Sequence, residues 1–196
     1  MSTPNPEPRW LVPAPYGYAS AIEGMGFVSA PLLAGFSVTL AVLVIQAQDS
    51  FRWPGVALFL FVAAALAFIA AVQFTFRARQ YAVTPPEIEM WWKDPNEPGR
   101  REMLRREQRY YQARHEAWAK PGRTAYDTGI LAFLLAVTII LVPHGGLDDA
   151  SAGRLATIAL AAVGLVGEGA WIVRTRSPIR GQVADWPPPP GPEMVS

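Results

Sequence analysis

Residues 55–76 read GVALFLFVAAALAFIAAVQFTF and contain no ionisable side chain. Because a helix rises about 1.5 Å per residue, a stretch of this length crosses the roughly 30 Å hydrocarbon layer of a bilayer. A second stretch without ionisable residues, 25–47, lies just before it. The two stretches predict a pair of transmembrane helices joined by a tight loop around residues 49–54.

Two further apolar stretches follow, at residues 124–142 and 155–173. Asp127 stands at the start of the third stretch, and Glu168 is the single acidic residue of the fourth. Hydrophobic residues make up 51% of the 196 residues and are gathered into four blocks, whereas a water-soluble core would disperse them. The chain therefore predicts an all-α membrane protein with four transmembrane helices arranged as two hairpins.

The distribution of Lys and Arg predicts the orientation of these helices. Eleven basic residues lie between residues 77 and 125 and three after residue 173, whereas the other two connections hold only Arg52 and Arg154. Basic residues collect on the cytoplasmic side, because their translocation is disfavoured. We therefore expect both termini and the central connection to be cytoplasmic, in a multi-pass protein of the cell (plasma) membrane.

Proline-rich tails flank the predicted hairpins. Proline fixes φ and removes a backbone donor, so the tails are expected to be extended polyproline II segments, either disordered or docked in an aromatic groove of a partner. The predicted organisation is a proline-rich N-tail (1–24), a first transmembrane hairpin (25–76), a basic helical insert (77–123), a second transmembrane hairpin (124–173) and a proline-rich C-tail (174–196).

The insert carries signals for two helices. The sequence Thr84-Pro85-Pro86-Glu87 fits a capping box at the start of a short helix. A longer helix is expected from about residue 98 to residue 119, because the sequence Lys120-Pro121-Gly122 is typical of a helix stop.

One stripe of the longer helix is aromatic, since Leu104, Tyr111 and Trp118 recur at a spacing of seven residues. A basic helix with an aromatic edge can lie on an anionic inner leaflet, pack on the short helix, or pair with a second copy. Seven acidic residues offset the eleven basic ones, and the resulting net charge of +4 disfavours nucleic acid as a partner. The residues expected to contact the membrane surface or a partner are Trp91, Trp92, Arg101, Arg105, Arg109, Tyr111, His115 and Trp118.

Small residues that share a helix face predict how the spans pack, since close approach of helices in lipid depends on small side chains. Four such faces predict a compact four-helix bundle, although the same faces could serve contacts between protomers: Ala30, Ala34, Ser37 and Ala41; Ala63, Ala67 and Ala70; Gly129, Ala132 and Ala136; and Thr157, Ala161 and Gly164.

Glu168 lies on the same helical stripe as Thr157, Ala161 and Gly164, so we expect it to point into the bundle. A charged carboxylate in an apolar setting costs roughly 2.5 kcal/mol or more. It is therefore expected to be protonated, paired or in contact with water, as a proton or cation site or as a structural ion pair. The candidate intramembrane polar site comprises Glu168, Asp127, Arg123, Arg174 and Gln73.

Motifs that carry catalysis are missing from the sequence. It has no Cys, only two His, and no HExxH, GxSxG or phosphate-cradling glycine loop, so neither a metal site nor a cofactor is predicted. The leading hypothesis is a non-enzymatic accessory, scaffold or sensor component, in contact with the anionic inner leaflet and forming a homo-oligomer or part of a larger membrane complex. The alternatives are a small oligomeric channel or transporter using Glu168, and a membrane enzyme with a polar cavity in which Asp127, Glu168 and Arg side chains converge.

Overall fold

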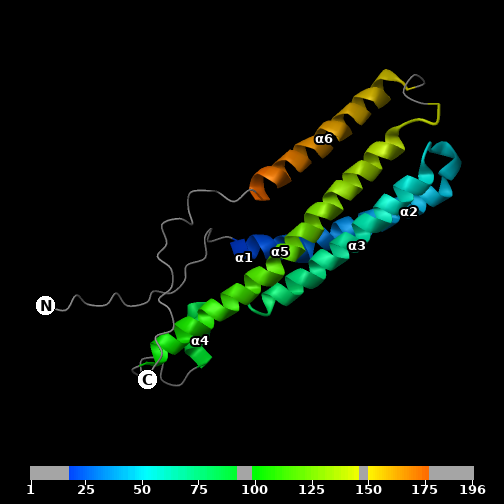
Figure 1. The fold of residues 1–196 in the computed structure, drawn as a ribbon. Helices are drawn as coiled ribbons and strands as arrows, with labels where there is room; N and C mark the ends of the chain where they lie inside the picture. Colours follow the sequence, from blue (N-terminus) through cyan, green and yellow to red (C-terminus); the bar gives the residue numbers. More distant parts are fainter. Residues whose placement is uncertain (1–17, 92–98, 146–149, 177–196) are drawn as a thin grey trace.

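The computed structural model describes residues 18–91, 99–145 and 150–176, which are helical apart from short connections and include no strand (Figure 1). Four helical stretches are long and apolar enough to cross a membrane: Tyr18–Gln46, Pro54–Arg79, Arg100–Leu141 and Ala152–Thr175. The prediction of an all-helical membrane protein with four spans is confirmed at this level. The proline-rich sequences of both tails lie outside the described residues. The elements are α1 (Tyr18–Gly24), the π-helical turn η1 (Met25–Ser29), α2 (Ala30–Gln46), the 3-10 turn η2 (Gln48–Ser50), α3 (Pro54–Arg79), α4 (Pro85–Trp91), α5 (Arg100–Leu141) and α6 (Ala152–Arg176).

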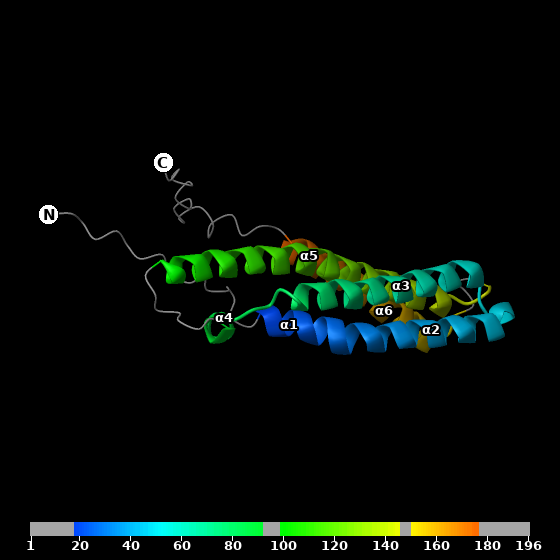
Figure 2. The same cartoon turned by 90° about the horizontal axis from the view of Figure 1, so that it is seen from below.

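Helix α3 lies at the centre of the packed core, between α2 and α5 (Figures 1 and 2). Its buried residues recur at alternating steps of four and three, which is the heptad pattern of coiled-coil packing. Alanines alternate along this seam with larger side chains. The seam consists of Ala57, Phe61, Ala64, Phe68, Ala71, Thr75 and Ala78.

Helix α5 places its smallest residues opposite the largest ones of α3. A Cβ atom added to Gly129 would lie 2.7 Å from Phe68 Cε1, and one added to Gly122 would lie 3.2 Å from the Cβ atom of Phe74. Phe68 is fully buried, so its ring fills the space that Gly129 leaves empty. The α3–α5 contact is therefore a match of side-chain volumes, of the kind that replaces the hydrophobic effect between helices in lipid.

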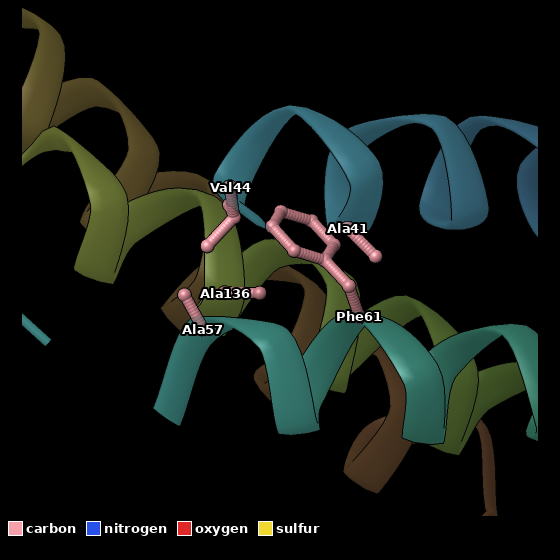
Figure 3. Close-up of a cluster of buried hydrophobic side chains, with 5 residues drawn as sticks. All are labelled: Ala41, Val44, Ala57, Phe61 and Ala136. Carbon is pink, nitrogen blue, oxygen red and sulfur yellow. The ribbon is translucent and has the colours of Figure 1, made fainter. Parts of the chain in front are cut away.

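A second cluster joins three helices near the opposite end of the seam. Figure 3 shows Phe61 projecting from α3 toward Ala41 and Val44 of α2, with Ala136 of α5 beside them. The ring of Phe61 also makes an edge contact with the Phe133 ring, with 5.8 Å between their centroids. The small faces predicted on the first and third spans are thereby confirmed as packing faces.

Within one chain, the face predicted on the second span is not the one that packs. Ala63, Ala67 and Ala70 are only half-buried, whereas Ala57, Ala64, Ala71 and Ala78 are fully buried. Helix α3 carries alanines on several faces, and the buried face is the one that also presents Phe61 and Phe68. Small residues occur on both faces of α3 and so do not distinguish them. The packing face is the one whose large side chains have a matching hollow on the neighbouring helix.

Helix α6 packs along α5 and lies at the edge of the assembly (Figure 1). Among its described side chains Ile172 alone is buried, and Thr157 and Gly164 are exposed. Within one chain the small face predicted on the fourth span is therefore only partly covered, and contact between protomers through this face stays a prediction. The more buried side of α6 includes the branched residues Ile158, Leu165 and Ile172.

The predicted helix stop at residues 120–122 is also wrong, since α5 continues through Pro121 for 42 residues in all. Proline removes one intrahelical hydrogen bond, which normally ends or kinks a helix. Here contacts with α3 hold the chain on both sides of it. Trp118 stacks on Phe74 with 6.2 Å between ring centroids, and Gly122 lies against the same residue. The predicted insert helix and the third span are therefore one element.

The first span starts earlier than predicted, because residues 18–24, before the predicted start at residue 25, are already helical. The π-helical turn η1 follows at the point where this span meets α3. Gly26 within the turn is buried, and a Cβ atom there would lie 2.4 Å from the side chain of Thr75. A glycine at this position allows the backbone of η1 to touch α3.

The capping box that starts α4 is confirmed. Glu87 Oε2 accepts hydrogen bonds from the Thr84 backbone N–H at 2.7 Å and from the Thr84 hydroxyl at 2.8 Å. The Ile88 N–H donates to the Thr84 carbonyl at 3.2 Å, and Ile88 is buried. The box therefore fixes the direction in which α4 leaves the end of α3 and docks on α5.

This box makes the stability of α4 depend on pH. The backbone N–H of Thr84, followed by its hydroxyl, lowers the pKa of Glu87 from its ordinary value of 4.5. A carboxylate with a lowered pKa in the folded state stabilises the helix above its ordinary pKa, and this contribution disappears as the pH falls through the lowered value. We expect the hydrogen-exchange protection of the Ile88 amide to fall in that acid range. Glu87→Gln should remove this pH dependence, whereas the control Glu89→Gln should retain it. The same pH dependence of Ile88 protection in both variants would contradict the prediction.

Candidate functional site

A cavity of about 910 Å³ lies at the end of the molecule where α3 and α6 finish, which we call the basic end. Its walls come from α1, the end of α3 with the connection to α4, the middle of α5 and the last turns of α6. Binding pockets for small molecules typically measure about 300–1,000 Å³. The cavity is therefore large enough for a ligand, and it is the strongest candidate site among the described residues.

The wall formed by α1, α3 and α4 carries one basic and two acidic side chains. Arg79, in the last turn of α3, forms an ion pair with Glu23 of α1. Glu87 of α4 is engaged by both donors of Thr84. Two of the three acidic residues that line the cavity are therefore already held by partners within the wall.

The α5 wall contains a buried histidine. His115 is 9% exposed, and its Nδ1 lies 3.0 Å from the Ala78 carbonyl oxygen at the end of α3. A carbonyl only accepts, so Nδ1 carries the proton and donates it. The Nε2 atom is buried and has no hydrogen-bond partner among the described residues. His115 therefore ties α5 to the C-terminal turn of α3 and keeps one polar atom unused beside the cavity.

The remaining wall joins α5 to α6 and carries the other basic side chains. Arg123 donates a hydrogen bond to Thr175 Oγ1 at 3.0 Å, and the Thr175 hydroxyl donates to the Ile172 carbonyl at 3.2 Å. Lys120 and Arg174 also line the cavity, and neither forms an ion pair within the described part of the chain. Three basic groups thus face the cavity from these two helices.

The residues predicted as an intramembrane polar site are only partly brought together. Arg123 and Arg174 both line the cavity. Asp127 is buried one turn further along α5, and Glu168 is half-buried on α6 without lining the cavity. Gln73 is exposed on α3. A role for Glu168 and Asp127 as a proton or cation site remains a prediction.

The residues predicted to contact the membrane surface or a partner divide into two groups. The aromatic stripe of α5 points inward, since Tyr111 packs against Tyr81 and Trp118 against Phe74, at centroid distances of 6.2 Å in both pairs, and His115 is buried. The exposed Arg101 and the half-buried Arg105 and Arg109 lie on the other faces. Trp92 and the side chain of Trp91 lie outside the described residues.

Several cavity residues were not predicted as site residues from the sequence, namely Tyr18, Glu23, Arg79, Lys120 and Thr175. Each lies within the first or last turns of a helix or beside Pro121, where polar side chains are common for reasons of solubility. The signal that would have found them is their convergence at one end of the molecule, which requires the positions of four helices in space.

No group of three or more His, Cys, Asp or Glu side chains among the described residues is placed to hold a metal ion. The site instead offers guanidinium and ammonium donors, tyrosine hydroxyls and an apolar wall, which suits binding of an anionic amphiphile more than covalent chemistry. Comparison of the chain with protein-family models, curated proteins and solved structures found no match.

Proposed function

We propose that this protein is a non-enzymatic scaffold or sensor component of the cell membrane, with both termini and the insert in the cytoplasm. The insert contacts a partner protein, a second copy or the inner leaflet. The spans anchor it, and α5 connects the two parts.

The observation that carries this proposal is the continuity of α5 across the predicted boundary between insert and membrane. A continuous helix transmits a displacement or rotation of one end to the other, whereas a flexible joint at residues 120–122 would absorb it. The basic residues at its N-terminal end, including the exposed Arg101, are therefore mechanically linked to Gly129 and Ala136 in the core of the spans.

The charge distribution supports the orientation. The basic end gathers Arg77 and Arg79 of α3, Lys120 and Arg123 of α5, and Arg174 of α6. At the other end Arg154 donates a hydrogen bond to the Leu141 carbonyl at 2.8 Å, which satisfies an unpaired group at the C-terminus of α5. Basic residues concentrated at one end favour that end as the cytoplasmic one.

A single introduced cysteine can test both orientation and contact, because the chain contains no Cys. With a membrane-impermeant maleimide we expect Ser50→Cys to be labelled on intact cells and Arg101→Cys only after permeabilisation. A photo-crosslinker attached at Arg101→Cys in native membranes should then give protein adducts, either of a second copy or of another membrane protein.

The control for the crosslinking is Phe59→Cys, since Phe59 is 71% exposed on the apolar α3 and is expected to face lipid. Adducts at Arg101→Cys no more abundant than at Phe59→Cys would contradict a scaffold that recruits proteins. Labelling of Arg101→Cys on intact cells would contradict the proposed orientation.

A further inference from the structure

We propose that the cavity at the basic end binds the phosphate group of an anionic phospholipid. This goes beyond contact of the insert with the inner leaflet, because it assigns a defined site between helices to a single lipid molecule. The proposal rests on the charge of the cavity, on its depth in the membrane and on its apolar wall.

The cavity lining carries an excess of positive charge. Four basic and three acidic side chains line it, so its formal charge is +1. Arg79 is paired with Glu23, whereas Lys120, Arg123 and Arg174 lie on the α5 and α6 walls, where Glu116 is the one acidic lining residue. Arg123 uses one nitrogen to reach Thr175, which leaves its other guanidinium donors available. Guanidinium and ammonium groups that converge in this way match the oxygens of a phosphate group.

The depth of the cavity matches that of a lipid head group. Arg79, the last residue of the span Pro54–Arg79, lines it, together with Tyr18 and Thr175 from two other spans. The ends of spans lie where the hydrocarbon layer meets the head groups, and basic pockets between helices at this level bind anionic head groups. A soluble anion would find the same donors, but the position favours lipid.

An apolar surface continues from the cavity along α6. Trp171 lines the cavity and is 63% exposed, and Gly164 and Leu160, which lie on the same face of the helix towards the middle of the span, are also exposed. Acyl chains of a lipid whose phosphate lies in the cavity can run along this surface. Most of α6 is exposed, which leaves room for a lipid beside it.

The experiment measures lipid bound to the full-length protein by native mass spectrometry, after reconstitution into nanodiscs of phosphatidylcholine with or without phosphatidylglycerol. We expect retention of phosphatidylglycerol in preference to phosphatidylcholine. Lys120→Gln should weaken this retention about fivefold, and Arg174→Gln about as much, because each removes one cation facing the phosphate. Lys120→Gln is the safer variant for folding, since Lys120 is exposed and its side chain makes no ion pair among the described residues.

The matched control is Arg114→Gln, which removes the same charge from an exposed position of α5, where Arg114 contacts the Tyr110 ring and lies outside the cavity. Equal loss in Arg114→Gln and Lys120→Gln would overturn the proposal, because it would show a general attraction of anionic lipid to the basic insert. Equal retention of both lipids by the unaltered protein would also overturn it. Glycerol 3-phosphate serves as a soluble competitor. If this competitor fails to displace the lipid, the result supports a lipid as the ligand of the cavity. Complete displacement overturns the proposal in favour of a soluble phosphate compound.

Discussion

Replacing Gly129 with leucine is expected to destabilise the protein by about 3 kcal/mol or more, near the upper end of the cost of overpacking a well-filled core. Even the first atom of the new side chain would lie 2.7 Å from the Phe68 ring, and the three further carbons have no space between α3 and α5. The measurement is the thermal unfolding midpoint in detergent, followed by the fraction of protein that remains monodisperse after heating.

Gly164→Leu is the matched control. Gly164 lies in the middle of α6, and a Cβ atom there would meet nothing within 4 Å. The same substitution should therefore leave the unfolding midpoint nearly unchanged. If Gly129→Leu were as stable as Gly164→Leu, the close contact of α3 with α5 would not exist in the protein.

Phe68→Ala is expected to cost about 3–5 kcal/mol, the usual price of removing a buried aromatic ring. The ring is fully buried and makes an edge contact with Tyr126, with 5.8 Å between the ring centroids. Its loss leaves an empty space beside Gly129. The measurement is again the unfolding midpoint, with Phe59→Ala as the control, because Phe59 is 71% exposed on the same helix.

The double variant Phe68→Ala, Gly129→Leu tests the volume match directly. The leucine can enter the space that the phenylalanine vacates, so we expect the double variant to be more stable than the sum of the two single effects predicts. Residues in contact commonly show interaction energies of about 0.5–3 kcal/mol in such cycles. Strict additivity would show that the two residues do not share a contact.

The buried face of α3 could not be predicted from hydropathy, for a reason that applies to any span. In water the buried face of a helix is apolar and the other face polar, so periodicity reveals it. In lipid every face of a span is apolar. Ala63, Ala67 and Ala70 looked as suitable as Ala64, Ala71 and Ala78, and only the hollows at Gly122 and Gly129 on α5 distinguish them.

The continuation of the helix through Pro121 could not be predicted either, for a related reason. Proline and glycine in succession are typical of a helix end, and the local cost of a lost hydrogen bond supports that interpretation. Trp118 stacks on Phe74, and Gly122 contacts the same residue. In both contacts the two partners lie far apart in the sequence. These contacts with α3 outweigh the local preference and keep α5 continuous. The same continuity brings His115 into the cavity wall instead of onto a free surface.

Length and composition by themselves determined that this chain has four helices able to cross a membrane, because crossing depends on how many consecutive residues are apolar and not on which residues they touch. The capping box of Thr84 and Glu87 could also be predicted from the sequence, since its partners are three residues apart. Only the tertiary structure decided which faces pack, that α6 stays at the edge, and that residues from α1, α3, α4, α5 and α6 enclose a cavity. Those features depend on the fit of side-chain volumes and charges between helices, which no local pattern records.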